Sequence, residues 1–154
     1  MDITYTQKDG IKLTGKGFTI VLDGPLDAKA DVALFSSVQE ARPSLTSFDS
    51  PGEYEVKGCM IDGVSMGEGT TAFRVDMEDI RLGYLPAFPA DGEKNTEALA
   101  GADALFVPLE AVEVEKVAKL VASLEPKIVV PIKYSEAELK VFLAEMGSKD
   151  VEPT

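Results

Sequence analysis

The stretch 48–63, with the sequence FDSPGEYEVKGCMIDG, constrains the fold more than any other part of the chain. Ser50-Pro51-Gly52 predicts a turn, because proline presets φ and glycine can supply a positive φ. Alternation of apolar and polar residues predicts strands over 53–56 and 59–64, on either side of a break at Lys57-Gly58. Two strands joined by so tight a break indicate a β-hairpin or a sharp corner in a sheet.

Short strands and turns also fill the rest of the first half of the chain. The glycine-rich segment 65–69 predicts a flexible loop, and 45–48 predicts a connection back to the hairpin. The wholly apolar run 32–35 is typical of a strand covered on both faces. Alternating or apolar runs predict strands at 3–6, 11–13, 18–22, 32–35, 71–75 and 80–85, of which the first three form an antiparallel meander.

Helices and strands alternate in the second half. An apolar stripe at helical spacing predicts a helix over 112–124. A second helix is predicted over 135–146, where Ser135 and Glu138 form a capping box. The sequence therefore predicts one α/β (α+β) domain over 1–154, with helices outside a mixed sheet or a pair of sheets. The other predicted elements are a short helix at 94–100 and covered strands at 104–107 and 128–130.

Composition excludes several classes of partner. The formal net charge is −12, which disfavours binding to nucleic acid or to an anionic membrane surface. No apolar run is long enough to span a membrane and no basic-then-apolar leader is present, so we expect a cytoplasmic protein. The single cysteine, Cys59, lies in an alternating strand and is expected to be a buried, unreactive side chain.

The absence of histidine is the most informative count. Among 154 residues there is none. A chain without histidine cannot form a Ser-His-Asp or Cys-His catalytic site, and it lacks the commonest zinc ligand. No phosphate-binding glycine loop and no CxxC pair is present either. We therefore expect no cofactor and no metal ion.

Four segments, DVALFSS, SPGEYEVKGCMIDGV, ADALFVPLEAV and EPKIVVPIKY, resemble in order and spacing the metallo-β-lactamase superfamily. Within it, the likeness is nearest to small metal-dependent hydrolases related to the UlaG-like lactonases. It extends over 3–146. The resemblance implies a four-layer αββα sandwich, here shortened, and in the family one or two metal ions are held at the loop-bearing edge of the two sheets.

The resemblance also implies that every metal ligand that can be matched has been replaced. The HxHxDH motif of the family falls on Ser37, Gln39, Ala41 and Arg42, and a further family histidine falls near 66–68. Ala87 takes the place of the bridging aspartate, and Lys133 that of the last histidine. The implied vestigial pocket consists of Ser37, Gln39, Arg42, Glu68, Ala87, Lys133 and Tyr134.

Three functions remain open on this reading. The first is a metal-free, non-catalytic module that binds a small anionic ligand, through Arg42 and Lys133, or a protein partner. In it, Arg42 and Lys133 either pair with Glu40 or Glu68 or point into solvent. The second is a hydrolase or lyase that uses other residues, such as a Ser37–Lys133 pair. The third is a self-associating subunit. Candidate residues for the second function are Ser36, Ser37, Arg42, Glu68, Tyr84, Lys133 and Tyr134.

Overall fold

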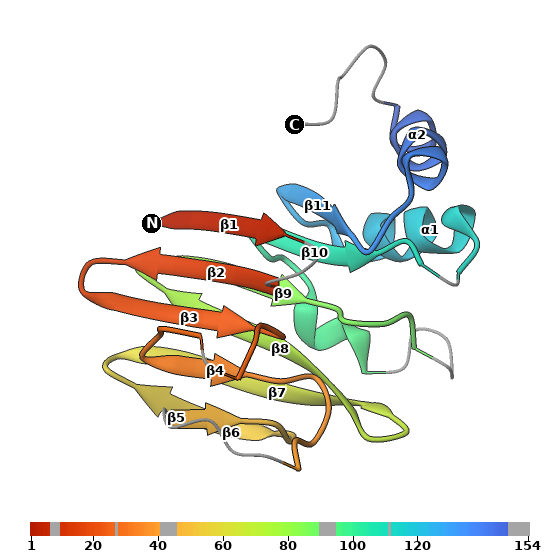
Figure 1. Ribbon diagram of the computed structural model, residues 1–154. Coiled ribbons are helices and arrows are strands. Elements are labelled where there is room, and N and C mark those ends of the chain that lie inside the picture. Colours follow the sequence, from red (N-terminus) through yellow and green to blue (C-terminus); the bar gives the residue numbers. More distant parts are fainter. Residues whose placement is uncertain (7–9, 27, 41–45, 90–94, 111, 148–154) are drawn as a thin grey trace.

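Two β-sheets lie face to face in the computed structural model, which describes residues 1–6, 10–26, 28–40, 46–89, 95–110 and 112–147 (Figure 1). The first sheet has the strand order β1-β2-β3-β4-β5. Its strands are β1 (Asp2–Thr6), β2 (Gly10–Gly15), β3 (Phe18–Leu22), β4 (Val32–Leu34) and β5 (Thr46–Phe48). The antiparallel meander of the first three strands is confirmed, and β4 and β5 extend the sheet in parallel.

The second sheet has the order β11-β10-β9-β8-β7-β6. The predicted hairpin is confirmed: β6 and β7 pair antiparallel around Lys57 and Gly58, whose φ angles of 50° and 78° are left-handed. β8 and β9 continue antiparallel, whereas β10 and β11 are parallel to β9. The strands are β6 (Gly52–Val56), β7 (Cys59–Gly67), β8 (Thr70–Met77), β9 (Ile80–Tyr84), β10 (Ala104–Pro108) and β11 (Ile128–Ile132).

Three local predictions were wrong. Segment 65–69 is not a loop: β7 continues to Gly67, and only Glu68 and Gly69 turn the chain into β8. The connection at 45–48 contains β5, which is held by parallel pairing with β4. β11 is an edge strand rather than a covered one, and Ile128 is 60% exposed. Pro131 fits this position because proline is tolerated on edge strands.

The main core lies between the sheets. Alternate residues of facing strands, among them Ile20, Leu34, Ile61 and Phe73, are fully buried there. Cys59 belongs to the same cluster and is 3% exposed. The predicted burial of Cys59 is therefore confirmed. Burial, and then the charge of Asp76, raises the pKa of the Cys59 thiol to about 11, which lowers the fraction of reactive thiolate.

A second core joins the helices to the outer face of the second sheet. In β10, Phe106 points into the space between the sheets, whereas Leu105 and Val107 pack on the helices. The sandwich class is therefore confirmed. Among the described residues, both α-helices belong to the side of the second sheet. The helical layer that the shortened αββα arrangement lacks there is the one on the first sheet. The helices are η1 (Thr96–Leu99), α1 (Val114–Leu124) and α2 (Glu136–Glu145), and none of them is long and apolar enough to cross a membrane.

Candidate functional site

The chain leaves β4, β9, β10 and β11 at the same edge of the sandwich, which we call the loop edge. Backbone hydrogen bonds fix the first residues beyond these strands: Leu85 donates to Phe106, and Leu109 donates to Ile132. Thr71, at the start of β8, donates its N–H to the carbonyl oxygen of Ser36 at 2.8 Å, which ties the second sheet to the segment after β4. Loops at the carboxyl ends of parallel strands are the usual place for functional residues.

A buried tyrosine and an aspartate join the two sheets at the loop edge. Tyr84, the last residue of β9, is 4% exposed, and its hydroxyl donates a hydrogen bond to Asp23 Oδ2. The other carboxylate oxygen of Asp23 accepts the N–H of Ser36 at 2.8 Å. Burial, followed by the charge and hydrogen bond of Asp23, raises the pKa of Tyr84 far above its usual value, so the phenol remains a donor.

Lys133 makes the second connection. Its φ angle of 50° places it in the left-handed region directly after β11, where the backbone changes direction. Its N–H donates to the hydroxyl of Tyr5, on β1 of the other sheet, at 2.9 Å. Its Nζ donates to the carbonyl oxygen of Pro86, after β9, at 2.6 Å. The backbone and the side chain of one residue thus tie three segments together.

The predicted pocket residues fall into separate groups. Lys133 and Tyr134 line an open cleft of about 420 Å³, which we call the Lys133 cleft. Glu68 and Ala87 line a hollow of about 90 Å³, with room for little more than a few water molecules. The remaining residues of the Lys133 cleft are Tyr5, Glu110, Ser135 and Glu138, and those of the hollow are Met66, Gly67, Thr70, Phe88 and Pro89.

Ser37 and Gln39 make bonds within their own loop. Gln39 Nε2 donates to the carbonyl oxygen of Ser37 at 2.9 Å, and the Gln39 N–H donates to Asp49 Oδ2 at 3.0 Å. No hydrogen bond connects Ser37 to Lys133, both of which the structure describes, so the geometry gives the Ser37–Lys133 pair no support. Arg42 and Ala41 lie outside the described residues.

Neither predicted arrangement is found for Lys133, whereas for Arg42, which lies outside the described residues, the two alternatives stay predictions. Within the described part of the chain Lys133 forms no ion pair with Glu40 or Glu68, and the latter two side chains are exposed. It does not simply point into solvent either, because Nζ bonds to Pro86. The carbonyl oxygen of a proline accepts one hydrogen bond from this amine, and the sequence contains no signal for such a backbone acceptor.

The described residues at the loop edge do not fit the metal ions of the resembled family. A hydrolytic metal centre needs several neutral nitrogen or carboxylate ligands. Across the described ranges, no three His, Cys, Asp or Glu side chains come together in a way that could hold an ion. Where the resemblance places ligands, Ala87 offers a methyl group and Lys133 an ammonium group.

Sequence reasoning missed the partners that shape this edge. The sequence pattern ends a strand at position 22 and gives Asp23 no role, and it does not connect Tyr5, Glu110 or Glu138 with the site. Tyr84 and Asp23 are separated by 61 positions. No local sequence pattern predicts a contact over this separation. The one available signal was the position of Asp23 and Tyr84 at the ends of strands that run to the same edge.

The fold is shared with several solved structures. One is a candidate Zn-dependent hydrolase of the metallo-β-lactamase superfamily from Thermotoga maritima, with a TM-score of 0.73 and 23% identity over 92% of this chain and 84% of that one. Another is a candidate metal-dependent hydrolase from Parabacteroides distasonis, with a TM-score of 0.71 and 13% identity over 97% and 90%. A third is a diphosphatase of the PhnP family, with a TM-score of 0.61 and 9% identity over 82% and 73%.

At these identities the structural likeness establishes the fold alone. No curated protein matches the chain. A family model described as "Beta-lactamase superfamily domain" matches residues 2–133, which is most of the sequence. This range includes both sheets and ends at Lys133, the residue that ties the loop edge together. The chain therefore belongs to the β-lactamase superfamily and has the metallo-β-lactamase fold.

Proposed function

We propose that this chain is a non-catalytic member of its superfamily, which binds a ligand or a partner at the loop edge without a metal ion. The observation that carries the proposal is the position of Lys133. Its ammonium group bonds to Pro86 O at 2.6 Å, beside Ala87, where the resemblance places a metal ligand. Fold alone does not confer activity, so the chemistry of the edge residues decides.

Electrostatics argue against a divalent ion beside this amine. At about 4 Å and an effective dielectric constant of about 20, a unit positive charge repels a divalent ion by about 8 kcal/mol. Several carboxylate or imidazole ligands would have to offset that repulsion. The sequence has no imidazole, and Glu68, the acidic residue of the implied pocket, is exposed. Binding without chemistry is the function that this set of side chains supports best.

The direct test is a measurement of metal content. The full chain is produced in medium supplied with zinc, manganese and iron, and the ions that remain after gel filtration are quantified by mass spectrometry. We expect far less than one ion per chain, and the same melting temperature with and without a chelator. One tightly held ion per chain, lost together with thermal stability on chelation, would contradict the proposal.

A further inference from the structure

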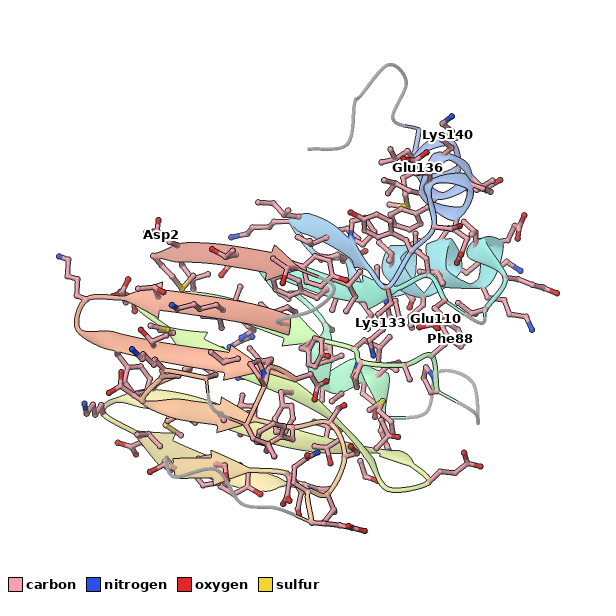
Figure 2. The ribbon with its side chains drawn as sticks, viewed as in Figure 1. Asp2, Phe88, Glu110, Lys133, Glu136 and Lys140 are labelled. Carbon is pink, nitrogen blue, oxygen red and sulfur yellow. The ribbon has the colours of Figure 1, made fainter. Side chains whose placement is uncertain are left out.

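The Lys133 cleft carries charges of both signs and is built from segments far apart in the sequence. Glu110 follows β10, Lys133 follows β11, Glu138 lies in the first turn of α2, and Tyr5 comes from β1 of the other sheet. Figure 2 shows Lys133 and Glu110 near each other at the end of the strands. A volume of about 420 Å³ lies within the range of small-molecule sites.

The opposite charges in this cleft do not neutralise each other. Among the described residues, no ion pair joins Lys133 to Glu110 or to Glu138. Lys133 Nζ gives one hydrogen bond to Pro86 and has two further N–H groups to donate. Glu110 is exposed, and no described side chain or backbone group donates a hydrogen bond to it. A donor and an acceptor of full charge thus remain available in the same cleft.

A ligand with a single charge is poorly matched to this lining. A carboxylate or phosphate that approaches Lys133 meets Glu110 and Glu138 in a protein of net charge −12. An amine that approaches Glu110 meets Lys133. Only a molecule that carries both groups can form a charge-assisted hydrogen bond with Lys133 and another with Glu110, and so bring each protein charge next to a ligand group of opposite charge.

We propose that the Lys133 cleft binds a small zwitterion of the amino-acid type, with its carboxylate on Lys133 and its ammonium group on Glu110. The rings of Tyr5 and Tyr134 form the less polar part of the lining, against which the side chain of the ligand packs. This inference rests on the proposed function, because it assigns a ligand to the metal-free loop edge. It differs from the expectation of a small anionic ligand, which stays a prediction.

The first test compares zwitterions with their singly charged analogues. The twenty common amino acids are titrated into ¹⁵N-labelled protein, and amide shifts are followed by NMR. Each amino acid that binds is then compared with its decarboxylated amine and its deaminated acid. We expect at least one amino acid to shift the amides of 133–138 and Tyr5, and both analogues to bind at least about tenfold more weakly. Equal binding of either analogue, or no binding of any amino acid below about 10 mM, would overturn the inference.

Two variants assign the two charges. Glu110→Gln should weaken binding of the amino acid by about tenfold, but not binding of the deaminated acid. Glu113→Gln is the matched control, because Glu113 is exposed, makes no side-chain cap hydrogen bond, and loses the same charge. Equal effects of Glu110→Gln and Glu113→Gln would show that only net charge matters, and would overturn the assignment.

Lys133→Met tests the contact with the carboxylate of the ligand. It should weaken the binding of the amino acid and the binding of the deaminated acid by similar factors. Lys133 also bonds to Pro86, so the NMR spectrum of the Lys133→Met variant is first checked for a folded protein. If that variant does not fold, the Glu110→Gln result still tests the inference. The metal measurement remains separate. A metal-free protein that binds no amino acid refutes this inference alone, whereas a stoichiometric ion refutes the proposed function.

Discussion

Tyr84 and Asp23 form the contact that most clearly separates the loop edge of this protein from an ordinary polar surface. Tyr84 is buried, so its hydroxyl requires a partner inside the protein, and the carboxylate of Asp23 supplies it. Asp23 itself has a left-handed φ of 49° and accepts the N–H of Ser36 with its other oxygen. One carboxylate therefore holds the ends of β3, β4 and β9 together.

Removing the phenol should destabilise the protein. We expect Tyr84→Phe to lower the free energy of unfolding by about 1–3 kcal/mol, because Asp23 loses a donor in a place where little water can replace it. Urea denaturation measures the effect. Asp23→Asn keeps an acceptor but loses the charge, and the double variant completes a cycle. Additive effects of the two substitutions would show that the pair does not act as a unit.

At the scale of the elements, the sequence predicted those whose pattern is local. The β6–β7 hairpin, the first meander, α1 and α2 all follow from turn residues and apolar periodicity within a short window. β5 and the end of β7 were missed because pairing with β4 and β8 makes them strands, although Thr46, Ser47, Ser65 and Gly67 are polar or glycine. Partner strands distant in the sequence outweighed local preference.

Gly63 has a structural role that the alternation of its strand does not predict. The alternation over 59–64 predicts it only as one position of a strand. In the structure a Cβ at Gly63 would lie 2.8 Å from the carbonyl oxygen of Ser50 and 3.2 Å from the Cα of Pro51. The turn before β6 therefore closes on β7, and only a residue without a side chain fits at this point. Such a close approach of two backbones cannot be recognised in one sequence.

The candidate site was predictable in outline only. The resemblance placed Lys133, Ala87 and Glu68 at one edge, and they do lie on the segments that meet there. It could not show that Lys133 bonds to a carbonyl oxygen, or that Glu110 and Tyr5 share its cleft. The contact with Tyr5 depends on the relative position of the two sheets, and the others depend on the pairing of β9, β10 and β11, none of which a periodicity encodes.

The capping box of α2 can be tested against a serine in α1. Ser135 accepts the N–H of Glu138 at 3.2 Å, and the Glu138 carboxylate accepts the N–H of Ser135 at 3.3 Å. Ser135→Ala should therefore lower the unfolding free energy by about 1 kcal/mol. Ser123→Ala is the matched control, since Ser123 bonds only to the Leu120 carbonyl within its own helix, and we expect almost no loss. Equal losses, measured by thermal denaturation, would contradict the role of the box.

At the scale of the whole molecule, carboxylates that accept backbone N–H groups join distant segments. Asp31 accepts from Thr19, Glu78 from Lys16 and Asp103 from Arg81, at 2.8, 2.7 and 2.8 Å. These backbone bonds are the main cause that lowers the pKa of each carboxyl below its usual value. Glu78 lies in the turn between β8 and β9 of the second sheet and Lys16 in a turn of the first, so this bond also connects the sheets.

The free energy of unfolding should therefore decrease at acidic pH and change little with pH near neutrality. A carboxyl whose pKa is lowered by folding stabilises the protein above its unfolded pKa of about 4, and this contribution is lost as the pH falls through the folded value. With no histidine and with the Cys59 pKa at about 11, no side chain of ordinary pKa titrates between pH about 6 and 8. We expect a constant urea midpoint in that range and a decrease below pH about 4.

Asp103→Asn should make the acid-induced decrease shallower, because one carboxyl with a lowered pKa is removed. Asp79→Asn removes the same charge from an exposed position in the turn between β8 and β9 and serves as the control. A steep change of the midpoint between pH about 6 and 8 would contradict this account, since no side chain of ordinary pKa titrates there.

The hydrogen bonds of Tyr84, Tyr5 and Lys133 have a consequence for how the protein matures. Every atom in them is supplied by the polypeptide, so this end of the molecule takes its final form as soon as the chain has folded. None of these hydrogen bonds depends on a component outside the polypeptide. Under the proposed function, the shape of this edge would therefore not vary with the ion supply of the cell.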